Sequence, residues 1–189
     1  MHQESEVTTC LRALNEGRFD VQLEGSDETA SLVNQLASRL QALSSEMNLL
    51  KVDLADDGRF GGQIEISNPQ GEWKTLVTNV NAISGNLTIH FRGPARVITA
   101  IANGDLTFQL TMDCRGEVKE LQDTINIMSA QFSELSSQIT QSVRAVGAGH
   151  PCEEIDVPGL AGTWKDLAAE VDTMAADVGL LSREAANTT

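Results

Sequence analysis

Sequence motifs that could bind a metal or a phosphate are scarce in this chain. His150-Pro151-Cys152 holds two metal-ligating side chains, but zinc takes three or four ligands, and a lone His-x-Cys is most often a surface feature. Gly61-Gly62 does not form a phosphate-binding loop, because no Lys-Ser or Lys-Thr follows it. We therefore predict no metal site and no cofactor site.

The histidines and carboxylates do not form a catalytic pattern either. The three histidines are His2, His90 and His150, and none is followed by the glutamate expected beside a phosphorylatable histidine. The motifs that bind ATP are missing as well. Glu72 and Glu117 are 45 residues apart, and we interpret each as a charge at a helix start, where it complements the helix dipole. We expect no catalytic residue and no enzyme activity.

The composition narrows the classes of partner and fold. The chain has 189 residues, with 27 acidic and 13 basic side chains and a net charge of -14. Such a charge argues against binding to nucleic acid, whose phosphates attract Lys and Arg. Aromatic residues make up 4% and AVILMFWYC residues 41%, so the core must be aliphatic. This composition favours long helices over a β-sandwich.

The sequence also predicts a cytoplasmic location. It has no run of 18 apolar residues that could span a membrane. Its first residues, 1–4, lack the basic and apolar parts of a secretory signal. The cysteines are three and widely spaced, which does not suit a disulfide framework.

A repeat of about 45 residues organises the chain. Residues that open a helical pattern recur at intervals of 44, 45 and 46; they are Glu28, Glu72, Glu117 and Thr163. We predict four units, at 5–50, 46–91, 92–137 and 138–183, followed by a tail at 184–189.

A second period of 91 residues is superimposed on the first. Trp73 and Trp164 both begin a Trp-Lys-x-Leu sequence, which ends at Leu76 and Leu167. The first and third units lack this tryptophan, so the unit types alternate. We expect both tryptophans to pack between helices; binding of a ligand is the alternative.

Each unit is predicted as a helix, an extended connector and a second helix. In the third unit, Pro94 suits a first helical turn and Gly104 suits a helix stop, as Gly58 does in the second unit. The connector 106–112 alternates apolar and polar residues, which predicts that Leu106, Leu110 and Met112 line a groove between helices.

The second helix of that unit follows Gly116-Glu117 and carries a heptad-like apolar stripe. The stripe includes Leu121, Ile125 and Met128, and it continues without a break into the fourth unit. A similar stripe predicts one helix from about residue 28 to 57. At the middle boundary, we expect His90-Phe91-Arg92-Gly93-Pro94 to break or kink the helix.

Two such helices bury little core by themselves. A connector of about a dozen residues can span a helix of similar length, so the two helices of a unit can run parallel. We therefore predict an all-α fold in which each unit forms a parallel four-helix bundle in a homodimer.

This pattern resembles the HAMP domain, the signal-relay module of histidine kinases and chemotaxis receptors. The resemblance covers about residues 5–183. The matching residues are Pro94, Gly104-Asp105-Leu106, Gly116-Glu117, Leu121, Ile125-Asn126 and Met128 in the third unit, Leu76 and Val80-Asn81 in the second, and Leu167, Val171 and Met174 in the fourth. The first unit departs by having Asp27-Glu28 in place of Gly-Glu, and the fourth by having Thr163 and Asp172 in place of Glu and Asn.

The alternating unit types resemble the poly-HAMP arrays of group III hybrid histidine kinases, known from fungi, although such arrays also occur in soluble bacterial receptors. The resemblance implies a non-catalytic relay in a two-component phosphorelay, with a histidine kinase or another output domain in cis or in trans. A structural dimerisation coiled coil and a ligand-sensing input module remain the alternatives.

Overall fold

All the regular secondary structure in the part that the structure describes is helical. The structure, a computed structural model, describes residues 2–187, and the surroundings of the side chains from residue 6 to residue 181. Its elements are α1 (His2–Asn15), α2 (Glu28–Lys51), the π-helical turn η1 (Val52–Asp56), α3 (Glu72–Ala102), α4 (Glu117–Gly147) and α5 (Thr163–Asn187). No strand occurs among the described residues, which confirms the predicted all-helical class.

The four residues of the predicted 45-residue repeat all begin helices. Glu28, Glu72, Glu117 and Thr163 are the first residues of α2, α3, α4 and α5. Gly71, Gly116 and Gly162 come just before the last three and have positive φ angles of 56°, 59° and 56°. At the start of α2 the cap differs, because the Asp27 carboxylate accepts a hydrogen bond from the Ala30 amide at 3.1 Å.

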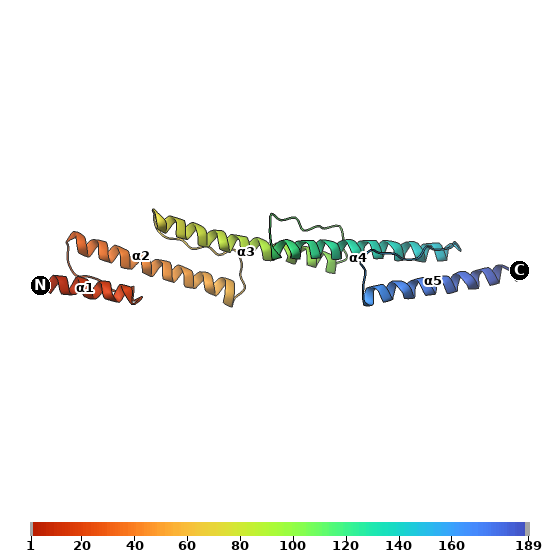
Figure 1. Ribbon diagram of the computed structural model, residues 1–189, viewed down its shortest axis with the longest axis horizontal. Coiled ribbons are helices and arrows are strands. Elements are labelled where there is room, and N and C mark those ends of the chain that lie inside the picture. Colours follow the sequence, from red (N-terminus) through yellow and green to blue (C-terminus); the bar gives the residue numbers. More distant parts are fainter. Residues whose placement is uncertain (1, 188–189) are drawn as a thin grey trace. The chain divides into compact units, whose positions relative to one another are not determined.

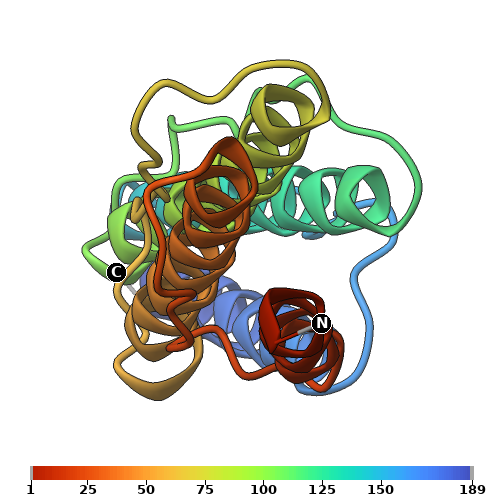
Figure 2. The ribbon, with the colours of Figure 1, turned by 90° about the vertical axis from the view of Figure 1, so that its left-hand side faces the viewer.

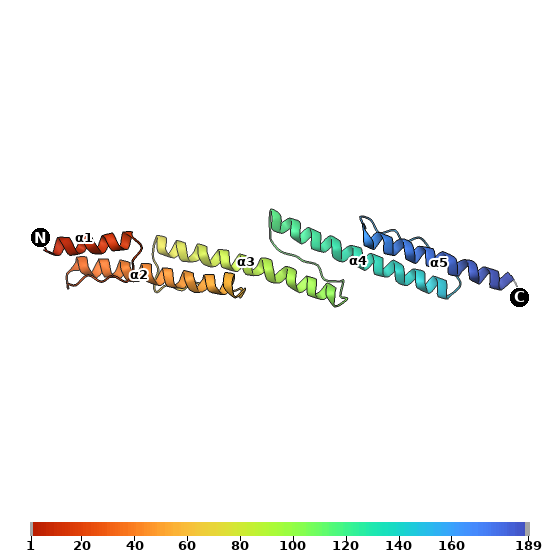
Figure 3. The same ribbon diagram turned by 90° about the horizontal axis from the view of Figure 1, so that it is seen from below.

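The chain divides into two units, Met1–Ile89 and His90–Thr189. In the first unit, α1 and α2 lie side by side and run in the same direction, because the connector between them returns along the pair (Figures 1 and 3). Their core consists of Leu14, Leu23, Ala30, Val33 and Ala37. Leu23 lies in the connector, so the connector belongs to the core.

The second unit repeats this plan. α4 and α5 lie side by side and are also parallel (Figures 1 and 3). One core cluster, around the connector between them, consists of Leu135, Ile155, Val157 and Ala168. Another, around the connector between α3 and α4, consists of Val97, Leu110 and Ile125. Seen along the helices, the connectors run over the outside of the helices that they join (Figure 2).

The helix does not break at residues 90–94, where the sequence predicted a break or a kink. α3 is one helix through Pro94, so this proline does not open a helix as the sequence predicted. A proline inside a helix costs about 3 kcal/mol, because it has no N–H and its ring crowds the preceding turn. Packing offsets this cost: Pro94 is buried, and a Cβ on Gly93 would lie 2.9 Å from the Met112 sulfur of the connector.

The predicted glycine stops are present. Gly17, Gly104 and Gly149 follow the ends of α1, α3 and α4 with φ angles of 82°, 83° and 72°. Beyond Gly104, the Asp105 amide donates back to the Ala100 carbonyl at 2.9 Å, which closes the last helical turn. The predicted helix 28–57 is α2 continued by η1, and Gly58 follows it with φ 65°. The predicted tail 184–189 is helical to Asn187, and its last two residues lie outside the described ones.

Candidate functional site in the connectors

Each connector is held by a polar side chain from the helix that follows it. In the connector between α3 and α4, the Leu110 amide donates to Asn126 Oδ1 at 2.8 Å, and Asn126 Nδ2 donates to the Leu110 carbonyl at 3.0 Å. Leu110 is only 4% exposed. The Asn126 amide therefore satisfies both backbone groups of a buried residue that has no neighbouring strand.

The same pair of hydrogen bonds, which we call a two-bond clamp, occurs in the first two connectors. Asn34 exchanges hydrogen bonds of 2.8 and 2.9 Å with the backbone of Leu23. Asn81 exchanges bonds of 2.8 and 3.0 Å with the backbone of Ile64. A side-chain amide has one donor and one acceptor face, so it pairs with one residue as a neighbouring strand would. This pairing explains how an extended connector can be buried outside a sheet.

The fourth connector is held differently, because Asp172 stands at the clamp position. Its two carboxylate oxygens lie 3.1 and 3.2 Å from the Ile155 amide nitrogen, which donates to them. An ionised carboxylate only accepts hydrogen bonds, so it offers nothing to the Ile155 carbonyl. Asp172 therefore holds one backbone group where each asparagine holds two.

α4, the helix before the fourth connector, supplies the two-bond clamp instead. The Asp156 amide donates to Gln138 Oε1 at 2.8 Å, and Gln138 Nε2 donates to the Asp156 carbonyl at 3.0 Å. Gln131 adds a bond from Nε2 to the Pro158 carbonyl at 3.2 Å. The fourth connector is thus attached mainly to α4, whereas the clamps of the other three come from the following helix.

Three further polar contacts hold the two middle connectors. The Met112 amide donates to Gln122 Oε1 at 2.8 Å, and the Ser129 hydroxyl donates to the Leu106 carbonyl at 3.2 Å. In the preceding connector, the Ser84 hydroxyl donates to the Gly62 carbonyl at 2.5 Å. Ser84 and Ser129 are buried, each three positions after its clamp asparagine.

The start of the connector after α3 is fixed by an acidic residue. The Thr107 hydroxyl donates to the Asp105 carboxylate at 2.7 Å, and the Thr107 amide donates to the same oxygen at 3.1 Å. These two donors, the hydroxyl first and then the amide, lower the pKa of Asp105. The Gly104-Asp105-Leu106 turn is therefore defined by local hydrogen bonds.

Of the predicted packing residues around this connector, Leu110 and Ile125 come together in one core cluster. Pro94, Leu110 and Ile125 are buried, and Leu106 and Met128 are half-buried. Gly104 and Gly116 lie at the two ends of the connector, and Glu117 is an exposed residue in the first turn of α4. Leu121 is exposed in the single chain. Their role in signal relay stays a prediction.

The predicted residues of the second and fourth units are mostly exposed. Glu72 is exposed and Trp73 half-buried at the start of α3, and Gly58 is exposed beyond η1. Trp164 is 49% exposed and packs edge-to-face against Phe132, with ring centroids 4.7 Å apart. Leu76 and Leu167 are exposed.

Sequence reasoning named two clamp residues without their role. Asn81 and Asn126 were identified only as parts of a resemblance, while Asn34, Gln138 and the one-sided bonding of Asp172 were missed. A signal was available, because an Asn or Asp follows a buried connector aliphatic by 17, 16 and 17 residues in the last three connectors. In the first connector the interval is 11 residues, which hides the pattern.

The described residues contain no group of three or more His, Cys, Asp or Glu placed to hold a metal ion. None of the helices, as far as they are described, is both long and apolar enough to cross a membrane.

Comparisons with known proteins agree with this geometry. Residues 68–134 match the HAMP domain family. The chain is also 25% identical, over 95 residues, to the methyl-accepting chemotaxis protein McpB of Pseudomonas aeruginosa; this covers 50% of the chain and 14% of the relative. No solved structure matches the chain significantly. Residues 68–134, which contain α3, a clamped connector and the first half of α4, therefore constitute a HAMP domain, and the distant chemoreceptor relative supports a general role in signal transduction.

Proposed function

We propose that this chain is a non-catalytic relay of a two-component system, of the histidine-kinase or chemoreceptor type. It transmits conformational changes along four HAMP units, at 5–50, 46–91, 92–137 and 138–183. It acts in the cytoplasm on a histidine kinase or another output domain, in cis or in trans.

The recurrence of the clamped connector carries this proposal. Two of the four connector contacts, Asn34 with Leu23 and Asp172 with Ile155, lie outside residues 68–134. In both places the connector joins two parallel helices, as Figures 1 and 3 show for α1 with α2 and for α4 with α5. A plain coiled coil needs no buried connector, so this feature favours a relay over a structural rod.

Exposed apolar residues along the helices support a parallel homodimer. A single chain leaves large apolar side chains uncovered on every α-helix. They include Leu32 and Leu36 on α2, Ile83, Leu87 and Ile98 on α3, Leu121, Ile127 and Val143 on α4, and Leu167, Met174 and Val178 on α5. A second copy packed along the same helices would cover them and complete a four-helix bundle at each connector.

Small and polar residues in the core support two packing states. Ser84, Ser129 and Ser142 are buried, together with Ala37, Ala168 and Ala175. Small side chains make fewer van der Waals contacts than leucine, so a shift of neighbouring helices changes the free energy less. A relay needs two arrangements that differ by only a few kcal/mol.

The relay is tested with the full chain fused ahead of a histidine kinase. Ile125→Ala and Leu121→Ala change the packing of α4 and should change kinase output while the far-ultraviolet circular dichroism stays helical. Thr124→Ala is the matched control, because Thr124 is exposed and its hydroxyl donates only within α4, to the Glu120 carbonyl. Kinase output that is unchanged in the first two variants contradicts the relay.

Disulfide cross-linking separates the relay from the structural rod. Single cysteines are placed at Leu121, Leu167 or Ile83 in a chain whose own cysteines are replaced by serine. A relay gives two cross-linking patterns that depend on the stimulus, and a rod gives one fixed pattern.

Tryptophan fluorescence tests the ligand-sensing alternative. Trp164 already packs against Phe132, which favours a packing role for this residue. A ligand that binds beside Trp73 or Trp164 would shift their emission on titration.

A further inference from the structure

The helical segment that leads into the second connector ends unlike the others. α2 passes at Val52 into the π-helical turn η1, in which the Asp57 amide donates to the Val52 carbonyl five residues earlier, at 2.9 Å. At the other connector-forming helices, the residue after the stop glycine donates to the carbonyl five residues earlier, as Asp105 does to Ala100. Arg59, which follows Gly58, donates instead to the Asp53 carbonyl six residues earlier. A π-turn typically contains one residue more than the α-helix would hold.

Three landmarks show where an extra residue lies. Each helical segment between two connectors has a clamp asparagine, a buried residue and the glycine that follows the segment. They are Asn34, Leu50 and Gly58 in α2 with η1, Asn81, Val97 and Gly104 in α3, and Asn126, Ser142 and Gly149 in α4.

The intervals between these landmarks differ in one place. The asparagine and the buried residue are 16 positions apart in all three segments. The buried residue and the glycine are 7 positions apart in α3 and α4 but 8 apart in α2 with η1. The extra residue therefore lies between Leu50 and Gly58, which is the stretch that contains η1.

An extra residue in a regular α-helix would have a large effect. Each residue turns the chain by about 100°, so Gly58 would leave the helix on a different side and carry the connector with it. The second connector nevertheless packs on its helix as the other connectors do. Ile64 is buried, and it lies six residues after Gly58, as Leu110 lies six residues after Gly104.

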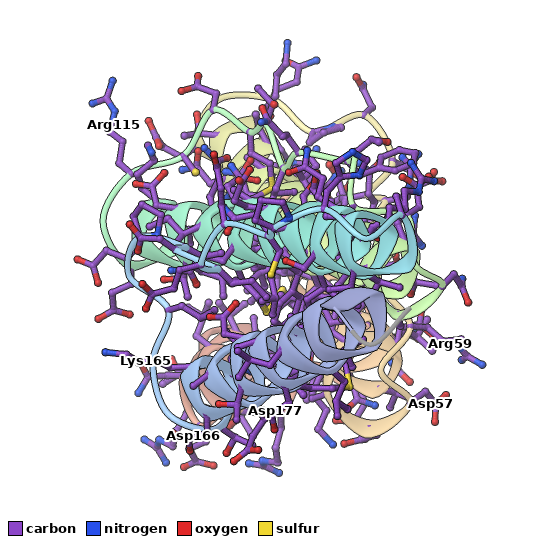
Figure 4. The ribbon with its side chains drawn as sticks, turned by 90° about the vertical axis from the view of Figure 1, so that its right-hand side faces the viewer. Asp57, Arg59, Arg115, Lys165, Asp166 and Asp177 are labelled. Carbon is purple, nitrogen blue, oxygen red and sulfur yellow. The ribbon has the colours of Figure 1, made fainter. Side chains whose placement is uncertain are left out.

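Side-chain pairs on η1 fit the π geometry. Lys51 Nζ and Asp56 Oδ2 are 2.6 Å apart, although these residues are five positions apart and would point about 140° away from each other on an α-helix. The Arg59 guanidinium contacts Asp53 at 2.7 Å and Asp57 at 2.8 Å, and Figure 4 shows Asp57 and Arg59 beside each other. These exposed pairs accompany the turn rather than carry its stability.

We propose that η1 is a register-compensating turn. It accommodates a one-residue insertion and keeps the second connector packed on its helix. It is a conformational device of α2 alone, and it operates whether or not the chain relays signals. The second connector would lose its packing on the helix if the extra residue were forced into an α-helical turn.

Amide hydrogen exchange of the full chain tests this proposal. The probes are the Ile64 and Leu110 amides, which donate to Asn81 and Asn126. Deletion of Ala55, an exposed residue of η1, should leave Ile64 protected, because α2 then continues as a regular α-helix to Gly58. Deletion of Ala102, an exposed alanine that ends α3, leaves that segment one residue short, so Leu110 should exchange at least about tenfold faster.

An insertion provides the converse test. One alanine added after Ala102 gives α3 the same spacing as α2 with η1, so a π-turn should form there and Leu110 should remain protected. The proposal is overturned if deletion of Ala55 exposes Ile64 or unfolds the first unit. It is equally overturned if deletion of Ala102 leaves Leu110 as protected as in the unaltered chain.

Discussion

A single functional group distinguishes the four connector clamps. Asn34, Asn81 and Asn126 each present one donor and one acceptor to a buried backbone. Asp172 presents two acceptors to the Ile155 amide and no donor to the carbonyl of the same residue. An isosteric change from NH₂ to O⁻ at this position therefore decides whether its side chain holds one or both backbone groups of the facing connector residue.

Replacing Asp by Asn, or Asn by Asp, at the clamp position should change the local stability of the connector in opposite directions. Asp172→Asn supplies a donor to the Ile155 carbonyl and should stabilise the fourth connector by about 0.5–1.5 kcal/mol. Asn126→Asp removes the donor to the Leu110 carbonyl and should destabilise the third connector by about 1–3 kcal/mol. Hydrogen exchange of the Ile155 and Leu110 amides measures both effects. Equal exchange rates before and after both substitutions would show that the second hydrogen bond contributes nothing.

A second prediction at this scale concerns the pKa of Asp105. The Thr107 hydroxyl lowers this pKa below its ordinary value of 3.8, so Thr107→Val should raise it toward that value. Because the carboxylate form is favoured in the fold, its contribution to stability is present above the ordinary pKa. The contribution is lost as the pH falls through the lowered pKa. NMR titration of the Asp105 carboxyl group measures the shift, and a pKa unchanged by Thr107→Val contradicts the assignment.

At the scale of elements, packing decides where helices continue and end. α3 continues through Pro94, although proline disrupts an isolated helix, because the 93–94 turn is packed against the following connector. The connector can come this close because residue 93 has no side chain. Helix propensity predicts a break here, and tertiary contact overrides it.

The two glycines of α3 provide a matched test of this explanation. Gly85→Ala should stabilise the chain by about 0.5–1 kcal/mol, because a Cβ there meets nothing within 4 Å and alanine has the higher helix propensity. Gly93→Ala should destabilise it, because its Cβ would lie 2.9 Å from Met112 Sδ and 3.2 Å from Leu110 Cδ1. Urea unfolding followed by circular dichroism compares the two variants. A similar gain in both would mean that the connector does not need the close approach.

At the scale of the whole molecule, charge and exposed apolar surface have opposite effects on assembly. The net charge is -14, and charged side chains such as Arg115, Lys165, Asp166 and Asp177 project outward from their backbones (Figure 4). Apolar residues such as Ile83 and Leu121 remain exposed on the helices of a single chain. Burial of these residues favours the proposed homodimer, and repulsion between two acidic chains opposes it.

Dimerisation should therefore strengthen with added salt. Two chains of charge -14 repel each other, and salt screens this repulsion within about 10 Å at 0.1 M ionic strength. Light scattering at increasing salt should show a larger fraction with twice the 20.3 kDa mass of one chain. Dissociation on addition of salt would indicate instead that ion pairs hold the dimer.

Local patterns were sufficient to predict the helical class and the starts of α2, α3, α4 and α5, although not the absence of a helix start at Pro94. Glu28, Glu72, Glu117 and Thr163 begin helices as predicted, because glycine and acidic residues mark these positions through backbone conformation and the helix dipole. Glycine stops were predicted from backbone conformation, and the buried Leu110 from the alternation of apolar and polar residues in its connector. These features depend on interactions within a few residues of each other, which a single sequence displays directly.

The continuity of α3, the clamps and the π-turn depend instead on contacts between distant segments. Asn126 meets Leu110 from 16 residues away, and Gln138 meets Asp156 from 18. The sequence contains these residues, but only the folded chain selects which backbone group each side chain satisfies. The passage of α3 through Pro94 likewise follows from burial against a connector. Local preference favoured a break there, and the free energy of tertiary packing outweighed it.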